Sequence, residues 1–160
     1  MKITVEYLKE KSACAEGVAW FVAHFPKGGE YQAVLDALAA DAKPDYAQWL
    51  LNAVGPTSAV LEVESWSGDW LFFAGTIKAA KGLSAVYGIK AGSGIKAGWG
   101  IKAGLQIFCK KELSAEFRIF AGIAIWKKEV TDDERSVICG KLVKGAISFG
   151  LLKEEKLFQE

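Results

Sequence analysis

The sequence is poor in the residues that bind metals or form disulfide bridges. It has one histidine, His24, and three cysteines, with no CxxC pair among them. A zinc site needs several Cys or His ligands, and an odd, unpaired cysteine count argues against a disulfide framework. We therefore expect no metal ion and no disulfides, and we place the protein in the reducing cytoplasm of a bacterial host.

Long apolar runs and a one-sided charge are also missing. No apolar stretch reaches the roughly 18 residues of a membrane-spanning helix, and the start, MKITVEYLKEKSA, lacks the apolar core of a signal peptide. A formal charge of +1 gives no overall attraction to nucleic acid or membrane. The glycines form neither GxGxxG nor GxxxxGK[ST], so no nucleotide motif is present and we expect no cofactor.

Charge is unevenly distributed along this nearly neutral chain. Residues 44–77 contain four acids and no lysine or arginine, whereas residues 78–111 contain seven lysines and no acid. The middle of the chain is therefore a basic block.

The first 56 residues have the pattern of short helices. Apolar residues recur at helical spacing in ACAEGVAWFVAHF, EYQAVLDALAADA and DYAQWLLNAV, with Ser12 as the expected N-cap of the first segment. Gly55-Pro56 ends the third segment. We therefore expect residues 1–56 to form a helical N-terminal unit.

After residue 56 the sequence repeats every six residues, most visibly in YGIKAGSGIKAGWGIKAG at 87–104. An aliphatic position is followed two places later by a small residue, and residues two apart in a strand share a face. The aliphatic position holds Leu71, Ile77, Leu83, Ile89, Ile95, Ile101, Ile107, Leu113, Ile119, Ile125, Val137, Val143 and Phe149. The small position holds Phe73, Ala79, Ala85, Ala91, Ala97, Ala103, Cys109, Ala115, Ala121, Cys139 and Gly145.

This pattern predicts a β-solenoid with an interior column of aliphatic and small side chains. We expect the glycines at the corners to supply unusual backbone angles. A period of six does not keep one face of a helix, which also tolerates glycine poorly. The predicted fold class is α+β: a small helical unit (1–56) packed on a β-solenoid (57–150), with a C-terminal helical cap (151–160).

The repeat from Leu71 to Trp126 resembles the hexapeptide repeats of triangular β-helices, which implies three units, or about eighteen residues, per coil. Here the small residue follows the aliphatic one instead of preceding it, so the handedness and cross-section of the coil stay open. SACAEGVAWFVAHFP, together with the GIKAG array, resembles uncharacterised bacterial and phage proteins. That resemblance implies a mobile-element context and no particular activity.

The residues between the aliphatic and small positions should point outward and are the candidates for partner binding. With eighteen residues per coil, Lys78 should stack over Lys96, with Lys90 and Lys102 on other faces and Tyr87 and Trp99 at corners. The candidate site residues are Lys78, Tyr87, Lys90, Lys96, Trp99 and Lys102. Solvated lysines that discourage strand-edge aggregation are the simpler interpretation.

No catalytic set is evident, and we expect a non-enzymatic protein. His24 is isolated on a helix, and Glu62 and Glu64 fit the solvated face of a strand. Our function hypothesis is an accessory inhibitor from a phage or mobile element, an antidefence protein of the anti-CRISPR kind. It would bind a host protein or nucleoprotein complex through the solenoid surface. Direct binding of nucleic acid, a self-assembling solenoid and a degenerate hexapeptide acyltransferase remain alternatives.

Overall fold

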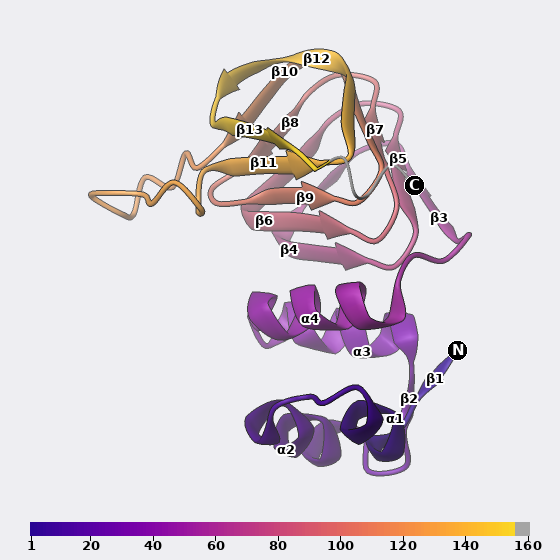
Figure 1. Cartoon of the computed structure of the whole chain (residues 1–160). Helices are drawn as coiled ribbons and strands as arrows, with labels where there is room; N and C mark the ends of the chain where they lie inside the picture. Colours follow the sequence, from indigo (N-terminus) through magenta and orange to yellow (C-terminus); the bar gives the residue numbers. More distant parts are fainter. Residues whose placement is uncertain (156–160) are drawn as a thin grey trace.

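The N-terminal part of the chain is a helical unit that stands at one end of the molecule. The structure is a computed structural model that describes residues 1–155. Two short strands and two pairs of helices make up this unit, and the second pair lies against the rest of the chain (Figure 1). The elements are β1 (Lys2–Ile3), α1 (Val5–Glu10), α2 (Ala15–His24), β2 (Gly29–Glu30), α3 (Tyr31–Ala40) and α4 (Pro44–Val54).

The helices near the start of the chain differ from the expected ones. There are four helices in this unit, because the six-residue α1 was too short to show a helical repeat. The proposed cap Ser12 has a left-handed φ of 62° and lies in the turn that ends α1. The N-cap of α2 is Cys14, whose sulfur accepts a hydrogen bond from the Gly17 amide. The expectation for Ser12 was therefore wrong. Pro44 opens α4, where its missing amide hydrogen is tolerated.

The remainder of the chain is a β-solenoid of about five coils, as the six-residue repeat predicted. Parallel strands pair with an offset of eighteen residues, so Ile77 lies beside Ile95 and Ile95 beside Leu113. The strands are β3 (Val60–Val63), β4 (Trp66–Phe73), β5 (Thr76–Ala79), β6 (Leu83–Ala91), β7 (Ile95–Ala97), β8 (Ile101–Ala103), β9 (Ile107–Cys109), β10 (Glu112–Ala121), β11 (Ser136–Cys139), β12 (Lys141–Phe149) and β13 (Leu151–Glu154).

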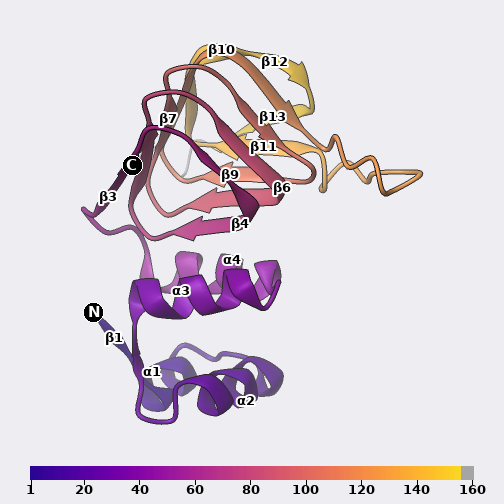
Figure 2. The same ribbon diagram turned by 180° about the vertical axis from the view of Figure 1, so that it is seen from behind.

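Each coil has three faces, which we name A, B and C. Face A holds β3, β5, β7 and the first halves of β10 and β12. Face B holds the first halves of β4 and β6, then β8 and the second halves of β10 and β12. Face C holds the second halves of β4 and β6, then β9, β11 and β13. Figure 2 shows this stack of coils from behind.

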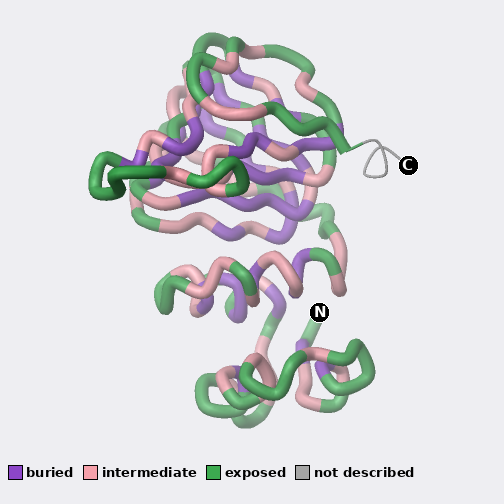
Figure 3. The backbone as a smooth tube through the Cα atoms, turned by 60° about the vertical axis from the view of Figure 1, so that its left-hand side comes forward, coloured by how far each residue is buried: buried purple, intermediate pink, exposed green. Residues whose placement is uncertain are grey.

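The interior column is the one the sequence predicted. Every aliphatic position from Ile77 to Ile119 is buried, and the small positions from Ala79 to Ala121 are buried beside them. In parallel stacked coils, equivalent side chains lie one above another, so the column is continuous. Figure 3 shows the buried segments, in purple, following one another from coil to coil. Burial of a full aliphatic side chain contributes roughly 1.5–3 kcal/mol, so this column stabilises the stack of coils.

The repeat stops earlier than expected, at Ala121. Ile125 is 97% exposed, and Val143 and Phe149 are also exposed, so their assignment to the interior was wrong. A loop between β10 and β11 raises the pairing offset from 18 to 30 positions, since Ile107 pairs with Val137. Twelve extra residues equal two repeats, which is why Val137 and Cys139 still point inward.

The last coil also departs from the predicted pattern. Register shifts between β10 and β12 bring Leu142 and Ile147 against the core in place of Val143 and Phe149. Residues 151–154, expected to be helical, form β13 beside β11. The rest of the predicted cap, 156–160, lies outside the described residues.

The helical unit covers the first coil. Phe72 and Ala74 of that coil are buried in the helical core with Leu35 and Leu51. The Gln32 amide donates to the Phe72 carbonyl (2.8 Å) and accepts from the Ala74 amide (2.9 Å). The Gln32 side chain of α3 thus takes the place of a neighbouring strand along the outer edge of β4.

Candidate functional site

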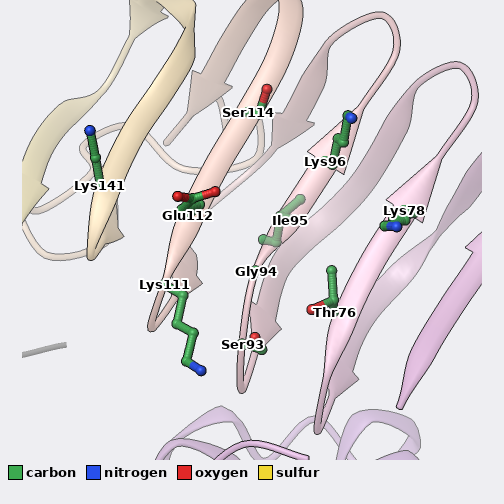
Figure 4. A pocket seen from close by; sticks show the side chains of 10 residues that line it. All are labelled: Thr76, Lys78, Ser93, Gly94, Ile95, Lys96, Lys111, Glu112, Ser114 and Lys141. Carbon is green, nitrogen blue, oxygen red and sulfur yellow. The ribbon is translucent and has the colours of Figure 1, made fainter. Parts of the chain in front are cut away.

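A basic groove lies across face A. Its volume is about 590 Å³, and it crosses β5, β7 and β10 with β12 at its far side (Figure 4). We call it the lysine groove and define it by its lining residues Thr76, Lys78, Ser93, Gly94, Ile95, Lys96, Lys111, Glu112, Ser114 and Lys141. Lys78 and Lys96 are register neighbours on adjacent coils, as the eighteen-residue coil predicted.

The groove is positively charged at close range. Its four lysines, Lys78, Lys96, Lys111 and Lys141, are exposed, and none has an ion pair within the described part of the chain. Glu112 is the one acid in the lining. Hydroxyl groups of Thr76, Ser93 and Ser114 lie among the ammonium groups, so the groove combines positive charge with neutral hydrogen-bonding groups (Figure 4). This combination suits carboxylate or phosphate groups.

An aromatic ridge runs along the corner between faces A and B. Trp99 is 53% exposed, and Phe117 on the next coil is 60% exposed. The Phe117 amide donates to the Trp99 carbonyl (2.9 Å), which fixes the two residues side by side. On the other side of Trp99, Lys81 lies 5.4 Å from the ring centroid and pairs with Glu64 (2.9 Å). The Trp99 ring is therefore held in place by Lys81, and the rest of its surface is open to solvent.

Lys102 lies beyond this ridge, on face B. It lines a shallow hollow of about 440 Å³ together with Trp66, Trp99, Phe120 and Arg118. Four of the six candidate residues, Lys78, Lys96, Trp99 and Lys102, thus lie on two adjoining faces. The other two lie elsewhere.

Lys90 is not on a free surface. It points outward from face C, but α4 covers it and leaves it only 6% exposed. Its ammonium donates to Gln48 of α4 (2.9 Å) and to Gln106 of the next corner (2.7 Å). Burial lowers the pKa of Lys90 to about 8, an effect that Asp133 and Asp45 partly offset. The expectation of a solvated Lys90 was wrong, because the docking of the helical unit on face C has no signature in the repeat.

Tyr87 is half-buried in a stack of aromatic rings at the corner between faces B and C. Its ring lies parallel to Trp70 at 5.4 Å and meets Trp126 edge-on at 5.3 Å. Tyr87 therefore supports the loop that carries Trp126, and it lies on a different edge of the solenoid from the lysine groove.

His24 and the three cysteines do not form a cluster. His24 is exposed in the outer helix pair, where it stacks on Trp20 at 4.2 Å. Cys109 and Cys139 lie in the interior column, and burial raises the pKa of both thiols. Cys14 is exposed. Within residues 1–155, no cluster of Cys, His, Asp or Glu has the arrangement of a metal site.

Several residues of this surface were missed from the sequence. Phe117 lies eighteen positions after Trp99, so the coil length would have placed the two together. Lys111 belongs to the basic block but follows a corner, outside the regular outward position. Lys141 comes after the twelve-residue insertion and pairs with Glu112, and no sequence signal places it beside β10.

The comparisons with known proteins concern the helical unit. Residues 1–54 match the YdhT N-terminal domain family. The match ends with α4, directly before the solenoid begins. No curated protein and no solved structure matches the chain. No helix in the described residues is long and apolar enough to cross a membrane.

Proposed function

We propose that this chain is a non-enzymatic binding protein whose solenoid recognises an acidic patch on a protein partner. The observation that supports this function is the lysine groove beside the open Trp99–Phe117 ridge. Trp, Tyr and Arg are enriched among the few residues that contribute most of the binding energy in protein interfaces, and Trp99 is such a residue. The groove supplies attraction and orientation, and the ridge supplies apolar contact.

A protein partner fits the charge pattern better than a nucleic acid does. Glu112 lies inside the groove, and Glu116, two residues after Ser114 of the lining, pairs with Lys144 (2.7 Å). Glu62 is the register neighbour of Lys78 on the first coil. These carboxylates would repel a continuous phosphate backbone, whereas a protein surface can match a mixed pattern of charge. The finer hypothesis, an antidefence inhibitor of a host protein or nucleoprotein complex, rests on the resemblance to phage proteins alone.

Affinity capture with charge-reversal variants tests this function. The tagged protein, its Lys78→Glu/Lys96→Glu/Lys111→Glu variant and a control with Lys9→Glu/Lys11→Glu are incubated with a bacterial lysate, and the bound proteins are identified by mass spectrometry. We expect a partner that the wild type and the control retain and the groove variant loses. All three proteins should fold, because the changed side chains are exposed, and the groove variant should melt at a somewhat lower temperature because reversal at Lys78 and Lys96 extends a row of carboxylates from Glu62.

The same experiment separates the two classes of partner. Capture that disappears after nuclease treatment, or steep salt-dependent binding of a fluorescent oligonucleotide, would assign the groove to nucleic acid. Identical capture by the wild type and the groove variant would overturn the proposed site. A Trp99→Ala variant measures the contribution of the ridge separately from charge.

A further inference from the structure

A second cavity lies in the helical unit, between the α1–α2 pair and the α3–α4 pair. Its volume is about 410 Å³, and its lining residues run from Ile3 to Leu50, so it belongs to the helical unit alone. Figure 1 shows the two helix pairs as separate layers. Leu8, Val34 and Leu38 are buried members of the lining. A cavity of this size with mainly apolar walls can enclose a small organic molecule.

Aromatic side chains from both helix pairs line this cavity. Trp20 and Phe21 come from α2, and Tyr46 and Trp49 come from α4. Phe21 is buried, whereas the other three are half-buried and keep part of their surface accessible. The face of an aromatic ring carries negative electrostatic potential, which attracts a positively charged group. Rings on two sides of one cavity can therefore surround such a group.

Two of these rings are held in place by the protein itself. The indole N–H of Trp20 donates to the Asp41 carboxylate (2.7 Å), and the Trp20 ring stacks on His24 at 4.2 Å. Tyr46 lies against Gly17, where a Cβ atom would stand 3.9 Å from the Tyr46 ring. Because the walls are already ordered, little conformational freedom would be lost on binding.

The charges next to these walls are negative. Among the described residues of the lining, Asp45 carries a charge at neutral pH and none is basic. Asp41 bonds to Trp20, and Glu16 lies close enough to Tyr46 to add to the effect of burial, which raises the pKa of the Tyr46 phenol. The three carboxylates are exposed, and none has an ion pair within residues 1–155.

Apolar surface, aromatic faces and nearby carboxylates are together the features that bind a substituted ammonium ion. Such an ion carries its positive charge inside a shell of apolar groups, so it suits an aromatic cavity. The Tyr46 ring already has a cation beside it, because the Lys43 ammonium, outside the lining, lies 5.9 Å from its centroid. A carboxylate or phosphate ligand would be repelled by Asp45. We propose that this cavity binds a free small organic cation of the substituted-ammonium class.

This site goes beyond the proposed function. The cavity and the lysine groove share no residue, and the charges around them are opposite in sign. The groove variant Lys78→Glu/Lys96→Glu/Lys111→Glu should therefore bind the cation as the wild type does, and Asp45→Asn should retain the captured partner. Failure of one proposal is thus distinguishable from failure of the other.

Three probes of similar shape and different charge test the proposal. They are para-hydroxyphenyltrimethylammonium, para-tert-butylphenol and para-hydroxybenzenesulfonate, which are positive, neutral and negative. Each is titrated into the full chain, labelled with nitrogen-15, and the indole N–H signals of Trp20 and Trp49 report where it binds. We expect the cation to shift both signals and to bind more tightly than the neutral probe by a factor of about 3 to 30. The sulfonate should bind most weakly.

Two pairs of variants separate charge from aromatic contact. Asp45→Asn removes the exposed carboxylate of the lining and should weaken binding of the cation, but not of the neutral probe, by a factor of about 2 to 5. Glu129→Gln, an equal charge change in the loop between β10 and β11, is its control. Trp49→Leu should weaken the cation more than the neutral probe, and Trp99→Leu, on the solenoid, should change neither.

Several results would overturn the proposal. One is the absence of indole shifts with every probe, and another is binding of the neutral or negative probe as tightly as the cation. A third is unchanged affinity for the cation in both Asp45→Asn and Trp49→Leu. Phosphatidylcholine vesicles display the same trimethylammonium group on a lipid surface. Flotation of the protein with these vesicles, in place of binding to the free cation, would also overturn it.

Discussion

Gly98 lies at a corner where one coil passes closely over the preceding one. A Cβ atom placed on it would stand 2.0 Å from the carbonyl oxygen of Ala80, eighteen residues earlier, and that oxygen belongs to the backbone. Gly92 and Gly104 make the same approach to the coil before them. None of the three has a positive φ. The corner glycines are therefore needed for close stacking, and the expectation that they supply unusual backbone angles was wrong.

This contact predicts a large effect for a single methyl group. Gly98→Ala should lower the free energy of unfolding by about 2–3 kcal/mol, because the coils have to move apart to admit the Cβ atom. Gly82→Ala is the matched control, since its Cβ atom would meet only Gly100 O at 3.5 Å. Denaturant unfolding followed by circular dichroism measures both. Equal stability of the two variants would contradict the stacking argument.

At the scale of elements, the end of the solenoid at the first coil needs protection against pairing with a strand of another chain. β4 has a partner strand on one side, β6, and the Gln32 side chain bonds to its other edge. An unprotected strand edge invites pairing with another chain. α3 therefore does the work of a strand at the first coil.

Gln32→Ala should remove this protection. It leaves the Phe72 carbonyl and the Ala74 amide without their partners, which should lower the free energy of unfolding by about 1–3 kcal/mol. Hydrogen exchange should show faster exchange of the Ala74 amide. Asp36→Ala is the control, because it removes only the second, exposed partner of Gln32 (2.8 Å). Unchanged exchange at Ala74 would show that the helix covers this edge without the bond.

The repeat predicted the solenoid elements well up to the loop and poorly after it. Ile77 and Ile119 were predicted correctly, because within the regular coils the period of six alone determines which side chains point inward. Ile125 breaks it because the chain leaves the stack after Ala121, and an aliphatic residue in phase gives no sign of that departure. Val143 fails for another reason: the register shifts beside β10 change which residues of β12 face the core. Leu151 and Leu152 suit an amphipathic helix equally well in sequence, and only pairing with β11 makes them a strand.

At the scale of the whole molecule, Lys90 joins three parts of the fold. It bonds to Gln48 of the helical unit and Gln106 of the solenoid, and Gln106 in turn bonds to Asp133 of the loop. This junction also shows what the sequence could not predict about the candidate site. The repeat places Lys90 on an outward position, but the packing of α4 on face C decides that the position is buried. Lys78 and Lys96, on the uncovered face A, match the prediction.

The buried ammonium predicts an unusual dependence of stability on pH. The pKa of Lys90 is about 8 in the folded chain and 10.5 in the unfolded chain, so the unfolded chain binds more protons between these values. The free energy of unfolding of the wild type should therefore rise with pH in this window, relative to Lys90→Met, by about 1 kcal/mol per pH unit.

Denaturant unfolding of both proteins between pH 7 and 11 measures this difference, and the other titrating groups cancel because they are common to both. Lys96→Met is the control, because it removes a lysine that is exposed and lies outside this junction. A constant difference between wild type and Lys90→Met would mean that Lys90 is hydrated at this junction.

The eighteen-residue coil also gives the molecule a unit of length. Each coil advances the stack by about 4.8 Å, the spacing of neighbouring strands. The stretch from Tyr87 to Gly104 is one such coil in nearly identical thirds. Its removal or duplication would leave the helical unit and the last coils unchanged, but would alter the distance between them. The distance between the two ends of the molecule therefore changes only in steps of one coil. A partner that contacts both ends would bind only one number of coils.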